Sequence, residues 1–444
     1  MRTVVLALAL LLAALSPATA QDACLTGAST LGDQRALADL REATEAACPC
    51  GAATSRGIWQ KCARNVLLGT VLRPECVKTA KTVNKGAACG STKVACGRVA
   101  SSNDAPSCKL TRDTRCKDTS KLDATACTDI DFCADAVTWS AGTCDDIRDQ
   151  GAFAPGFRQI VYTKDSVASP GNPRALDTAI WYPAAPGSGP ITGPGLGVVG
   201  APVDPSGAPY PLVLFSHGSC GYPLQSVFLT PLLASRGYIV AAPPHPGNTL
   251  NEFPNCGSPA AQVASFQERP QDIVYVLDQL LAANADPGSP FFGMIDPTRI
   301  AMAGHSFGGL TVYLVQQIEP RVKVAIPMAP AAQPGFTLTV PSLTILGNID
   351  TVVNNPNART AYLNHVAPKY LVEIEHAGHY AFSNLCFAGP DCNPPTTLDQ
   401  DEAHDQVLRY VVPFLERHLN GDERYAAFFA EPPPPGVVEQ QVQP

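Results

Sequence analysis

The serine of the pentapeptide 304–308 (GHSFG) is the side chain best suited to nucleophilic chemistry in this sequence. An apolar run at 299–303 precedes it and further apolar residues follow at 310–315, so the serine falls on a turn between a buried strand and a helix. The two flanking glycines leave room for a tight turn that lifts the hydroxyl above the sheet. The first N–H groups of the helix then face any negative charge that forms beside it. The pattern predicts that Ser306 is a nucleophile.

Two later residues could activate that hydroxyl. A serine is a poor nucleophile without a base, and chains with this strand–serine–helix turn order their triad as Ser…Asp/Glu…His. We expect His379, on the loop after the last predicted strand, to be the base, with His376 as the alternative. Asp350 follows a buried strand with no other carboxylate between Glu319 and Glu373, and it is the predicted acid that orients the imidazole. The other late histidines are expected at solvated helix positions: His365, His404 and His418.

An oxyanion forming at the substrate carbonyl needs two backbone N–H donors. The residue after the nucleophile, Phe307, is one predicted donor. The second is expected from the loop after the apolar strand 211–216, where Gly218 allows close approach of the backbone. Ser219 is the first choice on that loop and Cys220 is the alternative.

Strands that alternate with helices must position these groups. The predicted strands are 157–163, 176–182, 211–216, 238–242, 299–303, 322–328, 342–346 and 370–374, and the predicted helices include 227–235, 272–283 and 400–420. Such alternation predicts an α/β fold with a mostly parallel sheet. Ligands bind at the carboxyl ends of such strands, and every candidate residue follows a strand at that edge. The Pro/Gly-rich crossover 329–341 is expected to be non-helical, which predicts an open site without a large lid.

Composition and the first residues bear on location. Arg2, the apolar run 4–15 and the Ala-Thr-Ala at 18–20 have the pattern of a secretory signal peptide over residues 1–20, so we expect a secreted or periplasmic protein. The alternative, a membrane anchor, is disfavoured because spanning needs about 20 apolar residues. We expect no transmembrane segment after cleavage. A net charge of −8 argues against nucleic-acid binding.

Cysteine usage divides the chain. Of the 16 cysteines, 12 lie within residues 21–146, which predicts a disulfide-rich, partly helical domain with helices at 33–47 and 58–68. Metal binding is the alternative, prompted by Cys48-Pro49-Cys50, but the region contains no histidine and we expect no metal. Residues 147–156 are the predicted linker, 157–430 the catalytic domain, and 431–444 a disordered Pro-rich tail.

The remaining four cysteines lie near the predicted site. A bridge between Cys220 and Cys256 would brace an oxyanion donor, and one between Cys386 and Cys392 would close a small loop behind the catalytic histidine. The alternatives are free thiols, or Cys220 as a nucleophile.

The second part of the chain resembles α/β-hydrolases of the dienelactone-hydrolase and platelet-activating-factor-acetylhydrolase type, with secreted polyester hydrolases as relatives. The matching residues are His217-Gly218-Ser219, His245-Pro246-Gly247-Asn248, Glu268-Arg269-Pro270-x-Asp272, Gly304-His305-Ser306-Phe307-Gly308-Gly309, Asp350 and His379. The resemblance implies a serine esterase without a cofactor, acting on short or oxidised acyl esters or on polyesters. Dienelactone hydrolases use a cysteine where this chain has Ser306, so the mechanism is carried over and the substrate is not.

The sequence therefore predicts an exported serine esterase that forms an acyl-enzyme on Ser306 and hydrolyses small-molecule or polymeric esters. Two alternatives remain open: amidase or peptidase action by the same triad, and a binding or adhesion protein whose hydrolase domain is vestigial.

Overall fold

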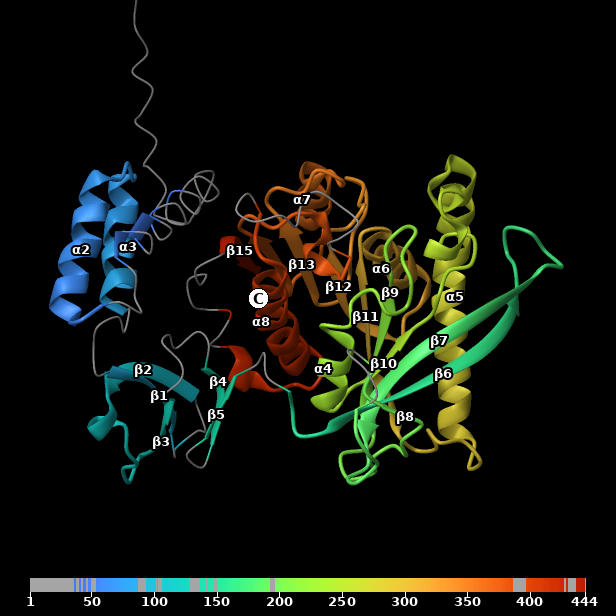
Figure 1. Ribbon diagram of the computed structural model, residues 1–444, viewed down its shortest axis with the longest axis horizontal. Helices are drawn as coiled ribbons and strands as arrows, with labels where there is room; N and C mark the ends of the chain where they lie inside the picture. Colours follow the sequence, from blue (N-terminus) through green and yellow to red (C-terminus); the bar gives the residue numbers. More distant parts are fainter. Residues whose placement is uncertain are drawn as a thin grey trace, which may run out of the picture.

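The computed structural model of the chain (Figure 1) describes most of its second part: residues 150–191, 196–385, 397–426 and 437–443. In the first part it describes 53–86, 93–100, 106–127, 136–140 and 143–146, with single residues between 36 and 48 and at 102 and 429. The predicted signal peptide, most of the predicted helix 33–47, and Cys386 and Cys392 lie outside the described residues. Within them, no helix is long and apolar enough for a membrane span.

The cysteine-rich part combines two helices with small antiparallel sheets. Its elements are α2 (Arg56–Gly69), α3 (Pro74–Gly86), β1 (Lys93–Ala100), β2 (Pro106–Arg112), η3 (Asp113–Arg115), β3 (Leu122–Cys127), β4 (Ala136–Ser140) and β5 (Thr143–Asp146). The helix predicted at 58–68 is confirmed as α2, which begins after the Ser55 cap and buries Trp59. Disulfides join Cys48 to Cys62 and Cys96 to Cys116, as expected where little apolar surface can be buried.

A ten-stranded sheet carries the second part. In spatial order its strands are β15 (Val437–Gln443), β14 (Lys369–Ile374), β13 (Ser342–Gly347), β12 (Val322–Met328), β11 (Ile295–His305), β9 (Tyr210–Ser216), β10 (Ile239–Ala242), β7 (Pro173–Ala184), β6 (Ala154–Asp165) and β8 (Val198–Val199). The six strands from β14 to β10 are mutually parallel, while β15 and β7 pair antiparallel at either side. The parallel core brings the carboxyl ends of six strands to one edge.

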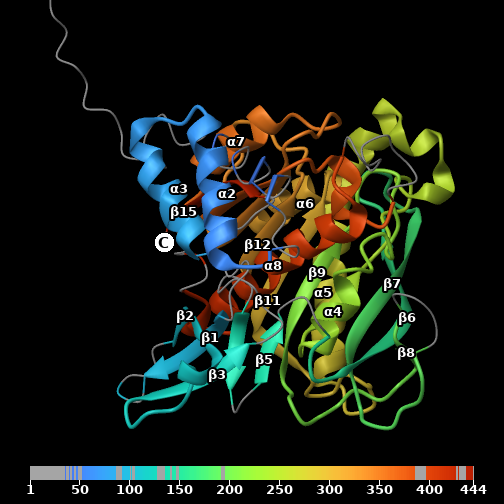
Figure 2. The same ribbon diagram turned by 60° about the vertical axis from the view of Figure 1, so that its left-hand side comes forward.

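Helices cover both faces of this sheet (Figures 1 and 2). Their bounds are α4 (Thr230–Ser235), α5 (Pro259–Ala285), α6 (Phe307–Ile318), α7 (Asn355–Leu363) and α8 (Gln400–His418), with short 3-10 turns η5 (Leu250–Glu252), η6 (Asn255–Gly257), η7 (His379–Phe382) and η10 (Glu423–Tyr425). One apolar core contains residues of α4 and α8, and the other contains residues of α5, α6 and α7. The sheet is buried on both faces, which explains its continuous apolar strands.

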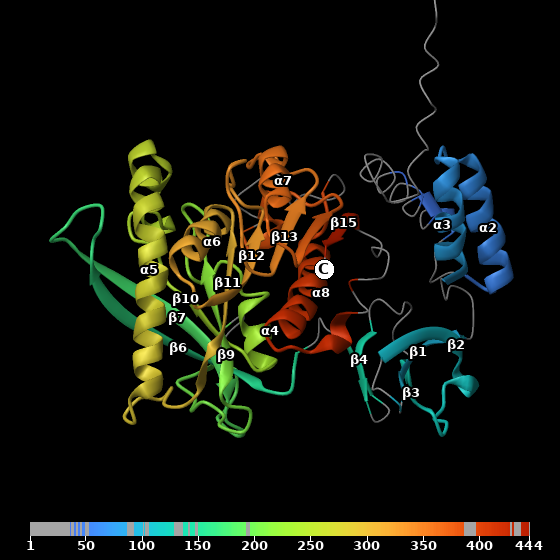
Figure 3. The same ribbon diagram turned by 180° about the vertical axis from the view of Figure 1, so that it is seen from behind.

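Two expected boundaries differ from the structure. The first strand of the sheet begins at Ala154, inside the predicted linker. The tail after residue 431 is predicted to be disordered, but β15 pairs with β14 from Ile374↔Val437 to Lys369↔Gln443. Figure 3 shows β15 on the β13 side of the sheet. The strand gives its hydrogen bonds to an edge that would otherwise be exposed, and Val437 is fully buried. The crossover 329–341 contains no helix, as predicted.

Candidate active site

The turn around Ser306 has the strained geometry that its flanking glycines predict. Ser306 precedes α6 with φ 59° and ψ −117°, a conformation that residues with a side chain rarely adopt. A Cβ on Gly308 would lie 1.9 Å from the Ser216 carbonyl oxygen, and one on Gly304 would lie 2.4 Å from the Gly308 oxygen. No side chain fits at either position. The packing of α6 against β11 and β12 holds this strained conformation, as is common at functional sites.

The predicted acid and base meet. The Oδ2 atom of Asp350 lies 2.8 Å from Nδ1 of His379. Its Oδ1 atom accepts hydrogen bonds from the N–H groups of Val352 (2.8 Å) and Val353 (3.0 Å), which fix the carboxylate on its loop. His379 is buried in η7, whereas the alternative base, His376, is exposed. The pairing with Asp350 leaves Nε2 of His379 as the ring nitrogen that can exchange a proton with a substrate.

A polar chain that the sequence did not indicate joins the base to the predicted oxyanion loop. The Nε2 atom of His305 lies 2.9 Å from the carbonyl oxygen of His379, and the two rings pack with centroids 4.7 Å apart. Burial lowers the pKa of His305 well below its ordinary value, so the ring is neutral. It donates through Nε2 and accepts at Nδ1 from the Gln225 amide, 3.1 Å away. The Gln225 Oε1 atom in turn accepts from the Gly218 N–H at 3.0 Å.

The loop after β9 passes directly beside the nucleophile. A Cβ on Gly218 would lie 3.4 Å from Cβ of Ser306. The Gly218 N–H is bonded to Gln225, and the Cys220 N–H donates to the Asn248 carbonyl oxygen at 3.2 Å. Within the described part of the chain, the N–H groups of Ser219 and Phe307 donate to no hydrogen-bond acceptor. These two remain available to an oxyanion.

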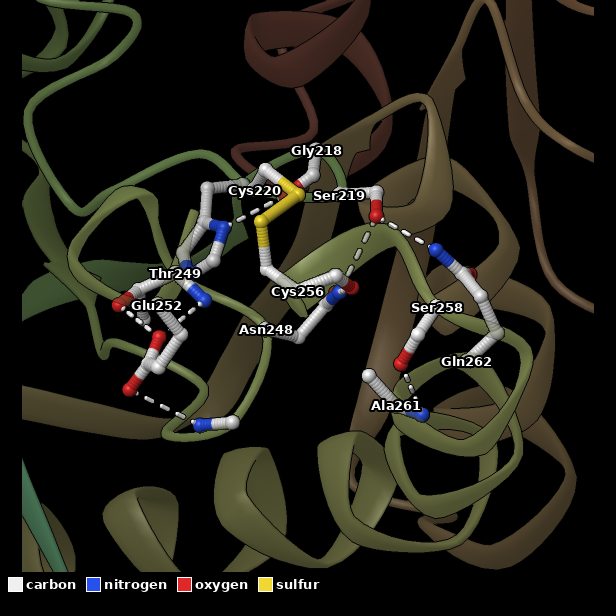
Figure 4. Close-up of a disulfide and its surroundings, with 12 residues drawn as sticks. Gly218, Ser219, Cys220, Asn248, Thr249, Glu252, Cys256, Ser258, Ala261 and Gln262 are labelled. Carbon is white, nitrogen blue, oxygen red and sulfur yellow. Dashed lines mark hydrogen bonds between the residues drawn. A yellow bond between two sulfur atoms is a disulfide. The ribbon is translucent and has the colours of Figure 1, made fainter. Parts of the chain in front are cut away.

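A dense set of cross-links holds this loop (Figure 4). The predicted disulfide between Cys220 and Cys256 is confirmed, so the alternatives of a free thiol or a nucleophile at Cys220 are wrong. The Ser219 Oγ atom accepts from Asn248 Nδ2 at 3.0 Å and from Gln262 Nε2 at 2.7 Å. Backbone and side chain of Ser219 are therefore fixed from two sides.

Arg269 supports the same loop from below. Its guanidinium is fully buried, donates to the Gly218 carbonyl oxygen at 3.0 Å and to the carbonyl of His217, and lies 4.7 Å from the centroid of the Phe307 ring. One side chain thus contacts the loop that carries Ser219 and the ring of Phe307, the two residues that are the predicted donors.

A second serine–histidine–aspartate arrangement lies in the core. The Ser216 Oγ atom is 2.9 Å from Nε2 of His245, and Nδ1 of His245 is 3.0 Å from Oδ2 of Asp272. All three residues are at most 1% exposed, and Asp272 is also paired with Arg174 at 2.7 Å. A substrate cannot reach this serine, so we assign the set a structural role.

Several histidines are buried and neutral. Burial lowers the pKa of His217, His245 and His305 well below 6.5. The expectation that His365 and His404 are solvated is wrong, because they are 5% and 6% exposed. Burial is the main cause that lowers the pKa of His365 to about 3. Its ring packs against Tyr313 and Tyr362, and the contact with Tyr313 joins segments that are distant in the sequence.

We expect this burial to destabilise the protein in mild acid. Histidines of the unfolded chain bind protons below about pH 6.5, whereas these stay neutral in the fold. The unfolded state therefore binds more protons, and the free energy of unfolding should fall by about 1.4 kcal/mol per pH unit per buried histidine between pH 6.5 and 5. Urea unfolding at several pH values measures this slope. His365→Gln should reduce the slope of the unfolding free energy by about 1.4 kcal/mol per pH unit, the contribution of one histidine. An unchanged slope would contradict the conclusion that His365 is neutral in the folded protein.

Comparison with known proteins places the chain in a family. The chain matches the family model described as PET hydrolase-like over residues 188–443, more than half of its length, and the cysteine-rich part lies outside the match. Cutinase est1 of Thermobifida alba is 25% identical over 234 residues, covering 52% of this chain and 67% of that protein. Bis(hydroxyethyl) terephthalate hydrolase of Streptomyces coelicolor is 23% identical over 253 residues, with 56% and 71% covered.

Similarity to a solved structure supports the assignment of the fold. A ferulic acid esterase from Streptomyces cinnamoneus superimposes with a TM-score of 0.51 and 26% identity, over 61% of this chain and 91% of that one. The resemblance that the sequence motifs indicated is therefore confirmed, as is the expected fold class. The chain belongs to the PET hydrolase-like family and is a carboxylic ester hydrolase with the α/β-hydrolase fold.

Proposed function

We propose that the protein is an exported serine esterase that cleaves carboxylic esters with Ser306, His379 and Asp350. The observation that supports this most is the 2.8 Å contact between Asp350 Oδ2 and His379 Nδ1, at the same sheet edge as the strained Ser306 turn. A carboxylate with both oxygens engaged holds the imidazole in one orientation and stabilises its protonated form. The leader-like first 20 residues and the disulfides support export.

In the proposed reaction Ser306 Oγ attacks the ester carbonyl carbon while His379 Nε2 takes the hydroxyl proton. The carbonyl oxygen becomes an oxyanion, which the N–H groups of Ser219 and Phe307 stabilise. The tetrahedral intermediate expels the alcohol, which leaves with the proton from the imidazolium. A water then loses a proton to His379 and attacks the acyl carbon, releasing the acid and restoring the serine.

The proposed substrate class is supported by the names of two relatives and by the uncovered carboxyl edge of the sheet. One relative is a hydrolase of a terephthalate diester and another an esterase for ferulic acid, so both are named for esters of aromatic acids. The crossover 329–341 has no helix that could cover the serine. We therefore propose small esters and polyester chains as substrates. Amidase action and a vestigial hydrolase domain have no comparable support.

Turnover of p-nitrophenyl acetate and butyrate tests this proposal, with the matching anilide as the amide control. A fluorophosphonate should label the protein once, and mass spectrometry of its peptides should locate the label on Ser306. Absence of turnover, or a label on another serine, would refute the proposed mechanism.

The disulfide beside Ser219 should contribute to both catalysis and stability. Replacing Cys220 and Cys256 together by alanine loosens one oxyanion donor, and we expect kcat to fall about tenfold, since complete loss of one donor costs 10²–10³-fold. Opening the 36-residue loop should lower the free energy of unfolding by about 4 kcal/mol. Steady-state kinetics and urea unfolding measure the two effects.

The matched control removes Cys48 and Cys62, which are bridged in the cysteine-rich part. That variant should keep the kcat of the parent protein. Equal kcat values in both double variants would show that the Cys220–Cys256 bridge does not position the donor.

A further inference from the structure

Arg269, on α5, is a buried cation without a direct anionic partner. Its side chain is fully buried, and among the described residues no carboxylate forms an ion pair with it. The Asp272 carboxylate is close enough to act on its pKa, but that carboxylate is paired with Arg174 and Lys164. Buried charges are normally paired, which makes the placement of this guanidinium unusual.

The hydrogen bonds of the Arg269 guanidinium go to neutral oxygens on and beside the loop after β9. The acceptors are the carbonyl oxygens of His217 and Gly218, the Asn248 Oδ1 atom and the Ser216 hydroxyl. Burial is the main cause that lowers the pKa of Arg269 to about 9, so the group is still positively charged at neutral pH. A full positive charge therefore faces the backbone carbonyls of this loop.

The Gly218 carbonyl belongs to the same peptide unit as the Ser219 N–H, the first predicted oxyanion donor. In a planar trans peptide the C=O and N–H bonds point in opposite directions. Three donors hold the carbonyl oxygen: Arg269 Nη2 at 3.0 Å, the Gly221 N–H at 3.1 Å and His217 Nδ1 at 2.7 Å. His217 donates through Nδ1 because its Nε2 atom accepts a backbone N–H at 3.1 Å. The Ser219 N–H is therefore directed away from the guanidinium.

We infer that Arg269 is a positioning residue for the oxyanion site, which fixes the peptide between Gly218 and Ser219 and polarises its N–H. This inference rests on the proposed function and assigns to that site a residue that touches no substrate. A hydrogen bond from a cation draws electron density toward the carbonyl oxygen, which makes the N–H of the same peptide a stronger donor. The reversed peptide would direct an oxygen at the developing oxyanion and would remove an acceptor from the guanidinium.

The same cation also lies against the second predicted donor residue. Its guanidinium carbon is 4.7 Å from the centroid of the Phe307 ring, which is within the range of a cation–π contact. A positive charge behind the loop favours a negative charge at the oxyanion, because little water screens the interaction in a buried site. This effect acts where the oxyanion forms and not on the bound ester, so it should change kcat more than KM.

Arg269→Met tests the inference, because methionine keeps a long apolar side chain and removes both the charge and the donors. With p-nitrophenyl butyrate we expect kcat to fall about 10²-fold, the size of losing one oxyanion donor, and KM to change less than about threefold. Arg269→Lys keeps the charge, but an ammonium cannot hold two carbonyls in the guanidinium geometry. Its kcat should fall about tenfold. Steady-state kinetics measures these values.

Inhibition by butylboronic acid gives a readout that a loss of stability alone would not change. Its boron accepts the Ser306 oxygen, whose proton passes to His379, and becomes a tetrahedral anion that resembles the proposed intermediate. Analogues of this kind report on binding of the transition state. The inhibition constant should therefore rise about as much as kcat/KM falls, by about 10²-fold in Arg269→Met and about tenfold in Arg269→Lys.

Arg158 supplies the matched control. Its guanidinium donates to the carbonyl oxygens of Gly200 and Ala201, each at 2.9 Å, and lies 5.9 Å from the centroid of the Tyr182 ring. It stands on β6, which is separated from β11 by β9, β10 and β7. Arg158→Met loses the same kinds of contact far from the proposed site. It should keep kcat and the inhibition constant within about twofold of wild type.

The possible outcomes separate the inference from the proposed function. If wild type does not hydrolyse the ester, the proposed function fails. If wild type is active and the folded Arg269 variants keep its kcat and inhibition constant within about twofold, the inference is overturned while the function stands. Three other results would also overturn it: failure of both Arg269 variants to fold in urea titrations, a fall in kcat without weaker boronic-acid binding, or an equal fall in Arg158→Met.

Discussion

Ser306→Ala should lower kcat for p-nitrophenyl butyrate by about 10⁶-fold, the loss seen when the nucleophile of a serine triad is removed. The side chain sits on a turn that its neighbours force into an unfavourable backbone conformation, with φ 59°. Alanine keeps that backbone and deletes only the oxygen that would form the ester bond to the acyl group. The residual rate should come from the oxyanion donors and from binding alone. A discontinuous assay at high enzyme concentration can measure this residual rate.

Ser216→Ala is the informative control, because Ser216 belongs to the second serine–histidine–aspartate set. That serine is fully buried and the Arg269 guanidinium lies 3.3 Å from its hydroxyl. Its loss should cost stability, about 1–3 kcal/mol for a buried hydrogen-bonded group, and leave kcat within about one order of magnitude. A large loss in Ser216→Ala with an active Ser306→Ala would reverse the assignment of the two sets.

The residues with local signals could be predicted from sequence. Ser306 is marked in the sequence by Gly304 and Gly308, which stand two residues on either side of it. Asp350 and His379 follow strands whose apolar runs are visible, and a parallel sheet brings the ends of such strands to one edge. The bridge between Cys220 and Cys256 follows for the same reason, since both cysteines come after adjacent strands β9 and β10.

Features that depend on packing between distant segments could not be predicted. Gln225 carries no motif, yet it joins Gly218 to His305 because the loop before α4 packs against the nucleophile turn. The strand β15 follows a Pro-rich stretch and has a polar sequence, so only its pairing with β14 reveals it. Tertiary contacts override local preference in both cases.

The second large expected effect concerns which histidine, His379 or His376, is the base. His379→Asn should lower kcat by about 10⁶-fold, because removing the base of a triad costs about as much as removing the nucleophile. His376 is exposed and has φ 53°, a conformation that asparagine tolerates. His376→Asn should therefore fold normally and keep kcat within a factor of about two, as for most exposed substitutions away from a site.

The double variant Ser306→Ala/His379→Asn tests whether the two residues act as one unit. A hydroxyl without a base and a base without a hydroxyl are equally inactive, so their losses should not add. The double variant should be no slower than either single variant in the same assay. Additive losses would mean that His379 acts on the substrate independently of Ser306. In that case the contact between Asp350 and His379 at 2.8 Å would position a general acid alone, and another group would have to activate the serine.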